Sequence, residues 1–409
     1  MNLQVFTCLE TVEKQWRRFE RVADCTVFQV YDWLKEWHRH IGSQHAVTPV
    51  IVLGHNVKED LLFILPLAIE TRRGVRRLVW LGSQLCDYHA PLLSPSYRDE
   101  VKQPFISIWR EVLRIIRQRP DLRFDFIELS RMPSTVGSQP NPFLELPRIR
   151  ASTFSSHLTD LPQDWDHFYN AKRSKSTRKK DRRALRQLAR HGEVRFIEAV
   201  ARADIDRTMT SLIHHKRLSY ARMAVPDIFD VDGVENFYRA VATNPLLQEI
   251  VHISRLDVAQ TPVATAFCLK FRGRYYSIMP TYDPVYAQYS PGRAHLHEMF
   301  RYAIKHNMDT FDFTIGDEAY KADWEDKIEP IFSYLDDITM IGTLVLKKRL
   351  VSQLIDSCYQ RVSNQTVRRV LRKSRRQLRK WTLAAPSSSA NVKAPILPSR
   401  TNSGGSEDH

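Results

Sequence analysis

The residues best suited to chemistry lie in one short stretch, Phe311 to Lys321. Asp312 stands between two phenylalanines in a strand-like run, so its side chain points away from the face that the rings share. The following loop carries Asp317, Tyr320 and their neighbours Glu318 and Lys321. Carboxylates and a phenol at the end of a strand are groups that can move a proton to or from a bound substrate.

A second candidate site begins about twenty residues earlier, at a predicted helix start. Its residues are Ser290, Gly292, Arg293 and Ala294. Glycine allows close approach to the backbone, and the free amides and dipole of a first helical turn favour an anion such as phosphate. The alternative is that Pro291 and Gly292 only start the helix.

The elements that position these residues occur twice. Apolar, β-branched runs separated by turn residues predict strands, and one-sided apolar periodicity predicts a helix before the last strand. In the first half the strands are at 48–55, 61–69, 75–82 and 124–129, with a helix at 103–118. In the second half the strands are at 248–256, 262–271, 274–282 and 311–313, with a helix at 292–306.

This order predicts a duplicated mixed α/β fold. Phe-Asp-Phe recurs at 124–126 and 311–313, and an aspartate precedes Ser-Pro by seven residues in both halves. Chance similarity of two strand-helix-strand units is the alternative. The first copy has Asp99 and Glu100 at its helix start, which would repel phosphate. We therefore expect a phosphorylated cofactor in the second half only.

Composition excludes several classes of protein. The chain has 409 residues with 43% hydrophobic residues, which is typical of a globular protein of two domains. Its five cysteines include no Cys-x-x-Cys pair, and no His/Cys cluster has the spacing of metal ligands. No apolar run is long enough to span a bilayer and no signal core is present. We expect a cytoplasmic protein without a metal.

The net charge of +15 is concentrated in two segments. Residues 172–190 hold ten Lys/Arg and one acid, Asp181, and residues 345–409 hold fourteen Lys/Arg and three acids. We expect domains at 1–150 and 193–343, a link at 151–192, a basic helix at 344–385 and a disordered tail at 386–409. The basic helix has an apolar stripe, which predicts contact with an anionic membrane surface; nucleic acid is the rival partner.

These motifs, in this order, resemble the CelD-like branch of the GNAT acyltransferase superfamily, which is related to FemAB-type transferases. The resemblance covers about residues 5–340. It is carried by the following features: Leu81-Gly82, Asp87-Tyr88, Arg182-Arg183 with Leu185 and Leu188, His214-x-x-Arg217, Tyr289-Ser290-Pro291-Gly292, Asp312-Phe313, Gly316-Asp317-Glu318 and Tyr320-Lys321. Leu218 departs from the pattern, because an aromatic residue commonly follows the arginine in this branch.

The resemblance implies tandem GNAT-like domains, each with a mixed, mostly antiparallel sheet, and acetyl-CoA as acyl donor in the second. The implied acceptor is a sugar or an envelope or exopolysaccharide precursor. Asp312 or Asp317 would act as base, and Tyr320 would protonate the leaving thiolate. Acceptor contacts would come from these residues: Asp87, Tyr88, His214, Arg217, Glu318 and Lys321.

Each role has a structural alternative: caps and turns for the acids, packing for Tyr320, and a paired His214 and Arg217. Two other functions remain open. One is a FemAB-type transferase that takes its aminoacyl group from tRNA. The other is a non-catalytic binding module with the same fold.

Overall fold

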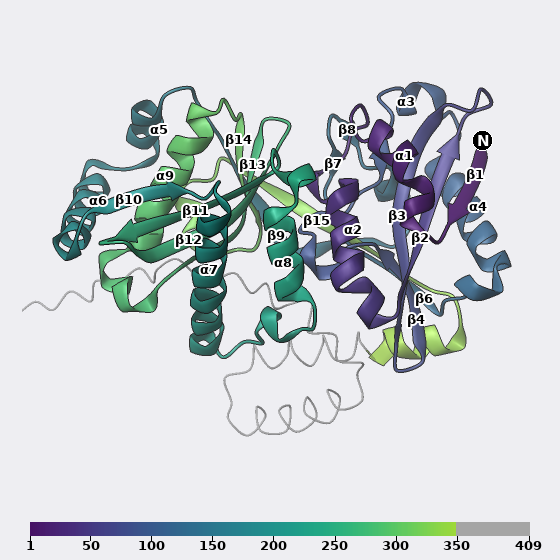
Figure 1. Ribbon diagram of the computed structural model, residues 1–409. Helices are drawn as coiled ribbons and strands as arrows, with labels where there is room; N and C mark the ends of the chain where they lie inside the picture. The colour runs from purple at the N-terminus through teal and green to yellow at the C-terminus, as the bar shows by residue number, and fades with distance from the viewer. Residues whose placement is uncertain (349–409) are drawn as a thin grey trace, which may run out of the picture. The chain divides into compact units, whose positions relative to one another are not determined.

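The computed structural model describes residues 1–348, which form two compact units. Unit 1 comprises Met1–Ser155, Asp230–Leu247 and the segment that begins at Glu329; unit 2 comprises Ser156–Phe229 and Gln248–Ile328. Neither unit is continuous in sequence, because the chain passes from one to the other several times (Figure 1). The predicted domain boundaries remain a prediction.

Unit 1 contains a mixed sheet in the order β1-β2-β3-β4-β6-β15. All neighbours are antiparallel except β4 and β6, which are parallel and follow one another through helix α4. The strands are β1 (Asn2–Phe6), β2 (Val47–His55), β3 (Leu61–Arg72), β4 (Val75–Trp80), β6 (Phe126–Met132) and β15 (Lys327–Asp337). The two-residue strand β5 (Leu92–Leu93) pairs with β3, and β7 (Thr135–Val136) and β8 (Gln139–Pro140) pair only with each other.

The helices of unit 1 bury both faces of this sheet. Helix α4 presents Phe105, Trp109 and Val112 to one face, where they pack with Val50 and Leu65. The alternate strand residues are buried as well, as expected when the second face is also covered. The helices are α1 (Leu9–Phe19), α2 (Tyr31–His40), α3 (Tyr97–Glu100), α4 (Phe105–Gln118) and α8 (Val234–Thr243).

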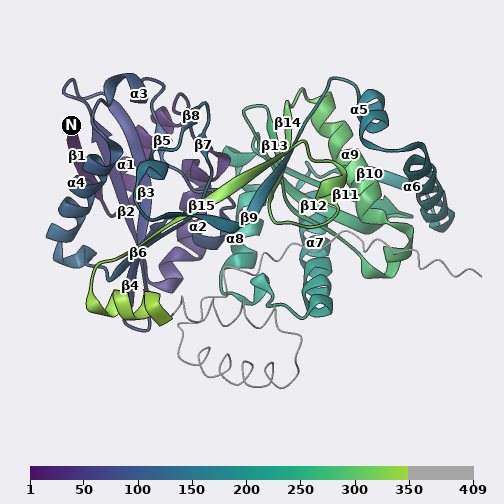
Figure 2. The ribbon, with the colours of Figure 1, turned by 180° about the vertical axis from the view of Figure 1, so that it is seen from behind.

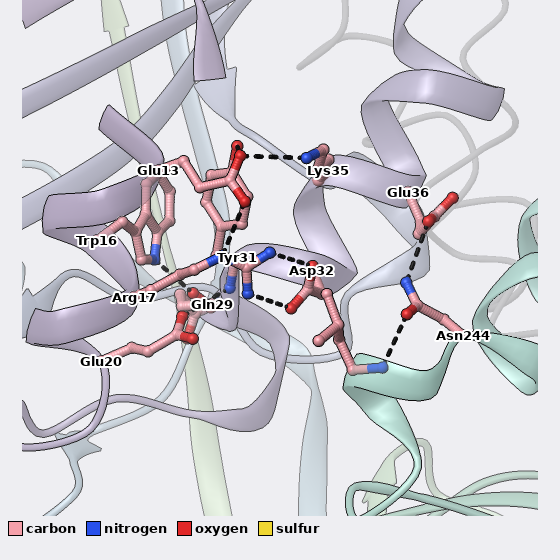
Figure 3. Close-up of polar contacts among 11 residues, drawn as sticks. Glu13, Trp16, Arg17, Glu20, Gln29, Tyr31, Asp32, Lys35, Glu36 and Asn244 are labelled. Carbon is pink, nitrogen blue, oxygen red and sulfur yellow. Dashed lines mark hydrogen bonds and ion pairs between the residues drawn. The ribbon is translucent and has the colours of Figure 1, made fainter. Parts of the chain in front are cut away.

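Polar contacts fix the helices of unit 1 to one another (Figure 3). Arg17 of α1 donates through both terminal nitrogens to the carboxylate of Asp32 on α2, at 2.5 and 2.7 Å. Asn244, directly after α8, donates to Glu36 of α2 at 3.1 Å. Residues 230–247, which lie within the predicted second domain, therefore belong structurally to unit 1.

Unit 2 repeats the same plan, in the order β9-β14-β13-β12-β11-β10. Here β13 and β14 are the parallel pair, and helix α9 connects them. The strands are β9 (Ile149–Asp160), β10 (Val194–Glu198), β11 (Val251–Val258), β12 (Thr261–Phe271), β13 (Arg274–Tyr282) and β14 (Thr310–Ile315). The helices are α5 (Trp165–Lys172), α6 (Lys175–Leu188), α7 (Arg202–Met223) and α9 (Pro291–Lys305).

Helices α7 and α9 cover opposite faces of this second sheet (Figures 1 and 2). Ser254 and Arg255 are neighbours on β11 and therefore point to opposite sides. Ser254 lies 3.0 Å from the His295 ring of α9, whereas Arg255 donates to Thr208 of α7 at 3.0 Å. The duplicated mixed α/β fold expected from the sequence is therefore confirmed, including its strands, connecting helices and predominantly antiparallel pairing.

Two strands come from unexpected places in the chain. Strand β15, which follows the second repeat, pairs with β6 of the first; β9, which precedes the second repeat, pairs with β14. Each repeat is thus paired with a strand from outside itself.

Candidate active site in unit 2

Strands β13 and β14 pair over only part of their length. Their parallel register ends with Tyr276 opposite Asp312, although β13 continues to Tyr282 and β14 to Ile315. Beyond this point the ladder between β13 and β14 ends, whereas β14 still pairs with β9 on its other side at Ile315. The two strands therefore separate at this end of the sheet, where an extended ligand could lie between them.

The predicted phosphate-binding residues lie where α9 begins, after a short 3-10 turn that follows β13. Ser290 adopts a left-handed conformation (φ 55°) and its carbonyl accepts the amides of Arg293 and Ala294, at 3.1 and 3.2 Å. Pro291 has no amide hydrogen, so Gly292 carries the first-turn amide for which residues 1–348 supply no acceptor. The backbone of this turn therefore fits one anionic group at Gly292.

Arg293 has a partner that the sequence did not reveal. Its guanidinium donates to Asp181 of helix α6 at 2.8 Å. The same buried carboxylate accepts the hydroxyl of Tyr169 at 2.9 Å and lies 4.0 Å from Arg173 and from the His297 ring. Asp181, the single acid of the basic link, thus holds α6 against the start of α9.

Asp312 is fully buried and its carboxylate shapes the strand. One oxygen accepts the Thr314 amide at 2.7 Å, and the other lies 3.4 Å from Arg274. Thr314 has a positive φ of 59°, and the pairing of β14 with β9 shifts register here. One oxygen of Asp312 thus supports the irregularity in β14 and the other meets Arg274 of β13, and the role of Asp312 as base stays a prediction.

The loop after β14 is organised by a buried lysine. Lys321 donates to the carbonyl oxygens of Thr314 and Gly316, at 3.2 and 2.6 Å, and pairs with Glu318 at 2.8 Å. Burial, reinforced by the Glu318 carboxylate, raises the pKa of Tyr320 well above its usual value. Lys321 and Glu318 fix the loop, and Tyr320 is protonated at neutral pH.

Asp317 is the most accessible acid of the group, with 49% of its side chain exposed. Its carboxylate lies 3.0 Å from Nε2 of His157, a buried residue of β9, and the other ring nitrogen of His157 contacts Glu325. A carboxylate joined to a histidine that a second carboxylate orients is an arrangement that can accept and pass on a proton.

Neither His157 nor Glu325 was predicted. His157 lies 160 residues before Asp317 and is brought to it by the pairing of β9 with β14. No local pattern surrounds His157, and only a prediction of this long-range pairing would have identified it.

The predicted His-x-x-Arg motif lies on the side of helix α7 that faces away from the sheet. His214 and Arg217 are exposed, and Arg217 lies 3.6 Å from Asp227. The residues that face the sheet are their neighbours His215 and Ser219, whose Nδ1 and Oγ have no hydrogen-bond partner within residues 1–348. Burial lowers the pKa of His215 to about 4, so its ring is neutral near pH 7.

The remaining predicted acceptor residues, Asp87 and Tyr88, lie in unit 1. Tyr88 is buried, with its ring 5.9 Å from that of Phe28, and Asp87 pairs with Arg131 at 3.6 Å. Arg131 also donates to the carbonyl oxygens of Gln84 and Cys86, at 2.7 and 2.9 Å. In unit 1 the loop after β4 is therefore bonded to β6, across the place that corresponds to the separated strands of unit 2.

The sequence also led to expectations about metal ions, membrane spans and the C-terminal region. No group of His, Cys, Asp or Glu among residues 1–348 is arranged to hold a metal ion. Within the same residues no helix is both long and apolar enough to cross a membrane. The predicted basic helix at 344–385 and the tail at 386–409 lie almost entirely outside the described residues, of which the last five, Leu344 to Lys348, are helical.

Comparison with known proteins supports an acyltransferase of the GNAT type, as the fold and the site indicate. Residues 175–322 match a family described as the acetyltransferase (GNAT) domain. The matched segment runs from the basic helix α6 to the loop that carries Tyr320, and this part of the chain is therefore similar to a GNAT acetyltransferase domain. No curated protein sequence matches the chain.

The fold is shared with the first two of the following solved structures, at low sequence identity. The crystal structure of FemX is 9% identical with a TM-score of 0.57 and covers 82% of this chain and 97% of its own. A conserved protein of unknown function from Bacteroides thetaiotaomicron VPI-5482 is also 9% identical, with a TM-score of 0.50 over 82% of this chain and 100% of that one. A tandem GNAT protein from the clavulanic acid biosynthesis pathway is 10% identical, with a TM-score of 0.43, and covers 82% of this chain and 98% of its own.

Proposed function

We propose that the protein transfers an acetyl group from acetyl-CoA to an amine or hydroxyl of a sugar or cell-envelope polymer precursor. One observation carries this proposal. The segment that matches a GNAT domain contains two strands that separate, and it also contains the start of α9, where the Gly292 amide fits an anion. An extended thioester would lie along the separated strands while its pyrophosphate meets the Gly292 amide.

The acids and the phenol of the following loop supply the proton transfers. Asp317, held by His157, accepts the proton of the acceptor as its nitrogen or oxygen bonds to the acyl carbon. The carbon–sulfur bond breaks, and Tyr320 donates its proton to the thiolate that leaves. Asp312 is buried, and each of its carboxylate oxygens has a partner within the protein. We therefore propose that Asp312 shapes β14 and that Asp317 is the base.

The acceptor class rests on the motif order that resembles the CelD-like branch, which is linked to cellulose and exopolysaccharide production. An acceptor of this kind fits a cytoplasmic enzyme that works at the inner face of the membrane. His215 and Ser219 are additional candidates for contacting it, because their buried polar atoms face the sheet beside which the acyl donor would lie.

Calorimetric titration of acetyl-CoA tests the donor and its site together. The wild-type protein should bind acetyl-CoA, and Gly292→Asp should abolish binding because a carboxylate would meet the pyrophosphate at the helix start. Asn307→Asp is the matched control: it adds the same charge just beyond the opposite end of α9, where Asn307 is exposed, and should bind as the wild type does.

The similarity in fold to FemX supports one alternative function, that of an aminoacyl-tRNA-dependent transferase. If the folded wild-type protein fails to bind acetyl-CoA but binds aminoacyl-tRNA, the acyl-CoA proposal is refuted and this alternative takes its place. If it binds neither, a non-catalytic GNAT-fold module becomes the better description.

A further inference from the structure

Helix α6 carries a straight row of positive charge on the side that faces away from unit 2. Taking about 100° per residue, five residues fall within an arc of about 100° and span about 17 Å along the axis. We call them the basic stripe: Lys175, Lys179, Arg182, Arg183 and Arg186. The opposite side of the helix holds the buried residues Asp181 and Leu188.

The stripe is exposed and its charges are not neutralised by the protein. All five side chains are exposed, and no carboxylate within residues 1–348 forms an ion pair with any of them. The one acid of the helix, Asp181, is turned inward and binds Arg293 of α9. Uncompensated cations repel one another and destabilise the helix, and an external anion would relieve this repulsion.

The helix is held rigidly, which makes the stripe a preformed surface. Asp181 ties α6 to Arg293 and to Tyr169, at 2.8 and 2.9 Å, and Leu188 is buried in a cluster with Leu256 and Val263. Because its inner side is occupied, α6 cannot roll to bury an apolar face in a bilayer. Any contact with a membrane would be electrostatic and at the level of the headgroups.

We infer that the basic stripe docks unit 2 onto an anionic phospholipid surface. A straight row of outward charges matches a planar array of headgroups. Leu185, beside the stripe, is 42% exposed and adds an apolar contact at the interface. The helix has no aromatic residue on which bases could stack, so it lacks one of the two features common in single-strand nucleic-acid sites. This surface is separate from the predicted C-terminal basic helix.

Co-sedimentation of the full-length protein with phosphatidylcholine vesicles, with and without phosphatidylglycerol, tests the inference. The wild type should bind only the anionic vesicles, less so as salt is raised. Arg183→Glu/Arg186→Glu should weaken binding by at least about tenfold, because each basic residue near such a surface contributes about a factor of five. Lys175→Glu/Lys179→Glu, at the other end of the stripe, should give a similar loss.

Arg72→Glu/Arg73→Glu is the matched control, since it makes the same change of charge at an exposed turn of unit 1 and should bind like the wild type. Melting curves establish that all variants are folded. Equal binding by the stripe and control variants would overturn the inference, as would a wild type that ignores anionic vesicles. Binding of RNA in place of vesicles, lost in the stripe variants, would also overturn it and identify a nucleic-acid surface. The acetyl-CoA titration is independent of all these outcomes.

Discussion

At the scale of single residues, the candidate site separates groups that hold the loop from groups that can react. Lys321, Glu318 and Asp312 are buried and bonded within the protein, whereas Asp317 is half-exposed and bonded to a histidine. Amino-acid type alone did not distinguish these acids. Their roles depend on burial and partners, and the partner of Asp317, His157, comes from β9, a strand distant in sequence.

His157→Gln tests the assignment of Asp317. Glutamine can bond one of the two carboxylates but cannot relay a proton between them, so acetyl transfer, measured as thiol release with a panel of amino sugars, should fall at least about tenfold. The dissociation constant for acetyl-CoA should stay unchanged, and Asp317→Asn should lower the rate to a similar extent. If His157→Gln reduces the melting temperature but leaves the rate and its pH profile intact, the histidine has only a structural role.

His295 provides a prediction about pH. Burial lowers its pKa to about 3, from an ordinary 6.5, so the folded chain keeps the ring neutral while the unfolded chain protonates it. The stability contributed by the neutral ring is therefore complete above about pH 6.5 and is lost as the pH falls toward 3, at about 1.4 kcal/mol per pH unit for this one group. Urea unfolding at pH 4.5, 5.5 and 7 gives the free energy of unfolding as a function of pH. In His295→Gln the slope of this dependence should be smaller by the equivalent of about one proton. An unchanged slope would mean that the ring is protonated in the folded protein.

At the scale of elements, periodicity predicted the individual helices and strands but not the pairing and packing of elements that lie far apart in the chain. The helix expected at 103–118 is α4, Phe105–Gln118, and the strands expected at 262–271 and 274–282 match β12 and β13 within a residue. Apolar residues recur at helical or strand spacing within each of these segments, so the local sequence is sufficient to predict the element. The exchange of β9 and β15 and the placement of α8 depend on partners far away in the chain, for which the sequence contains no local pattern.

Helix α8 offers a test of this placement. Phe237 is fully buried, and its ring meets that of Trp33 on α2 edge to face, with centroids 5.0 Å apart. Phe237→Ala should lower the free energy of unfolding by about 3–5 kcal/mol, because it leaves a cavity in the packing of unit 1. Leu246→Ala, at an exposed position just after the helix, should change it by no more than about 0.5 kcal/mol. Equal effects on unfolding would contradict the packing of α8 on α2.

At the scale of the whole molecule, the duplication could be predicted from sequence, but its interleaving could not. The repeated order of strands and the two Phe-Asp-Phe motifs predicted two similar units. Unit 1 takes α8 from within the second repeat and β15 from after it. The first repeat is therefore incomplete without later parts of the chain.

This interleaving predicts how fragments behave. Residues 1–155 expressed alone lack β15, which leaves β6 with an unpaired edge, and lack α8, which leaves Trp33 of α2 without its cover. We expect this fragment to bind a hydrophobic dye and to unfold without a cooperative transition. Co-expression with residues 156–409 should restore both missing elements and a cooperative transition. A fragment 1–155 that unfolds cooperatively by itself would show that its core does not depend on these elements, and the exchange would then serve only to join the two units.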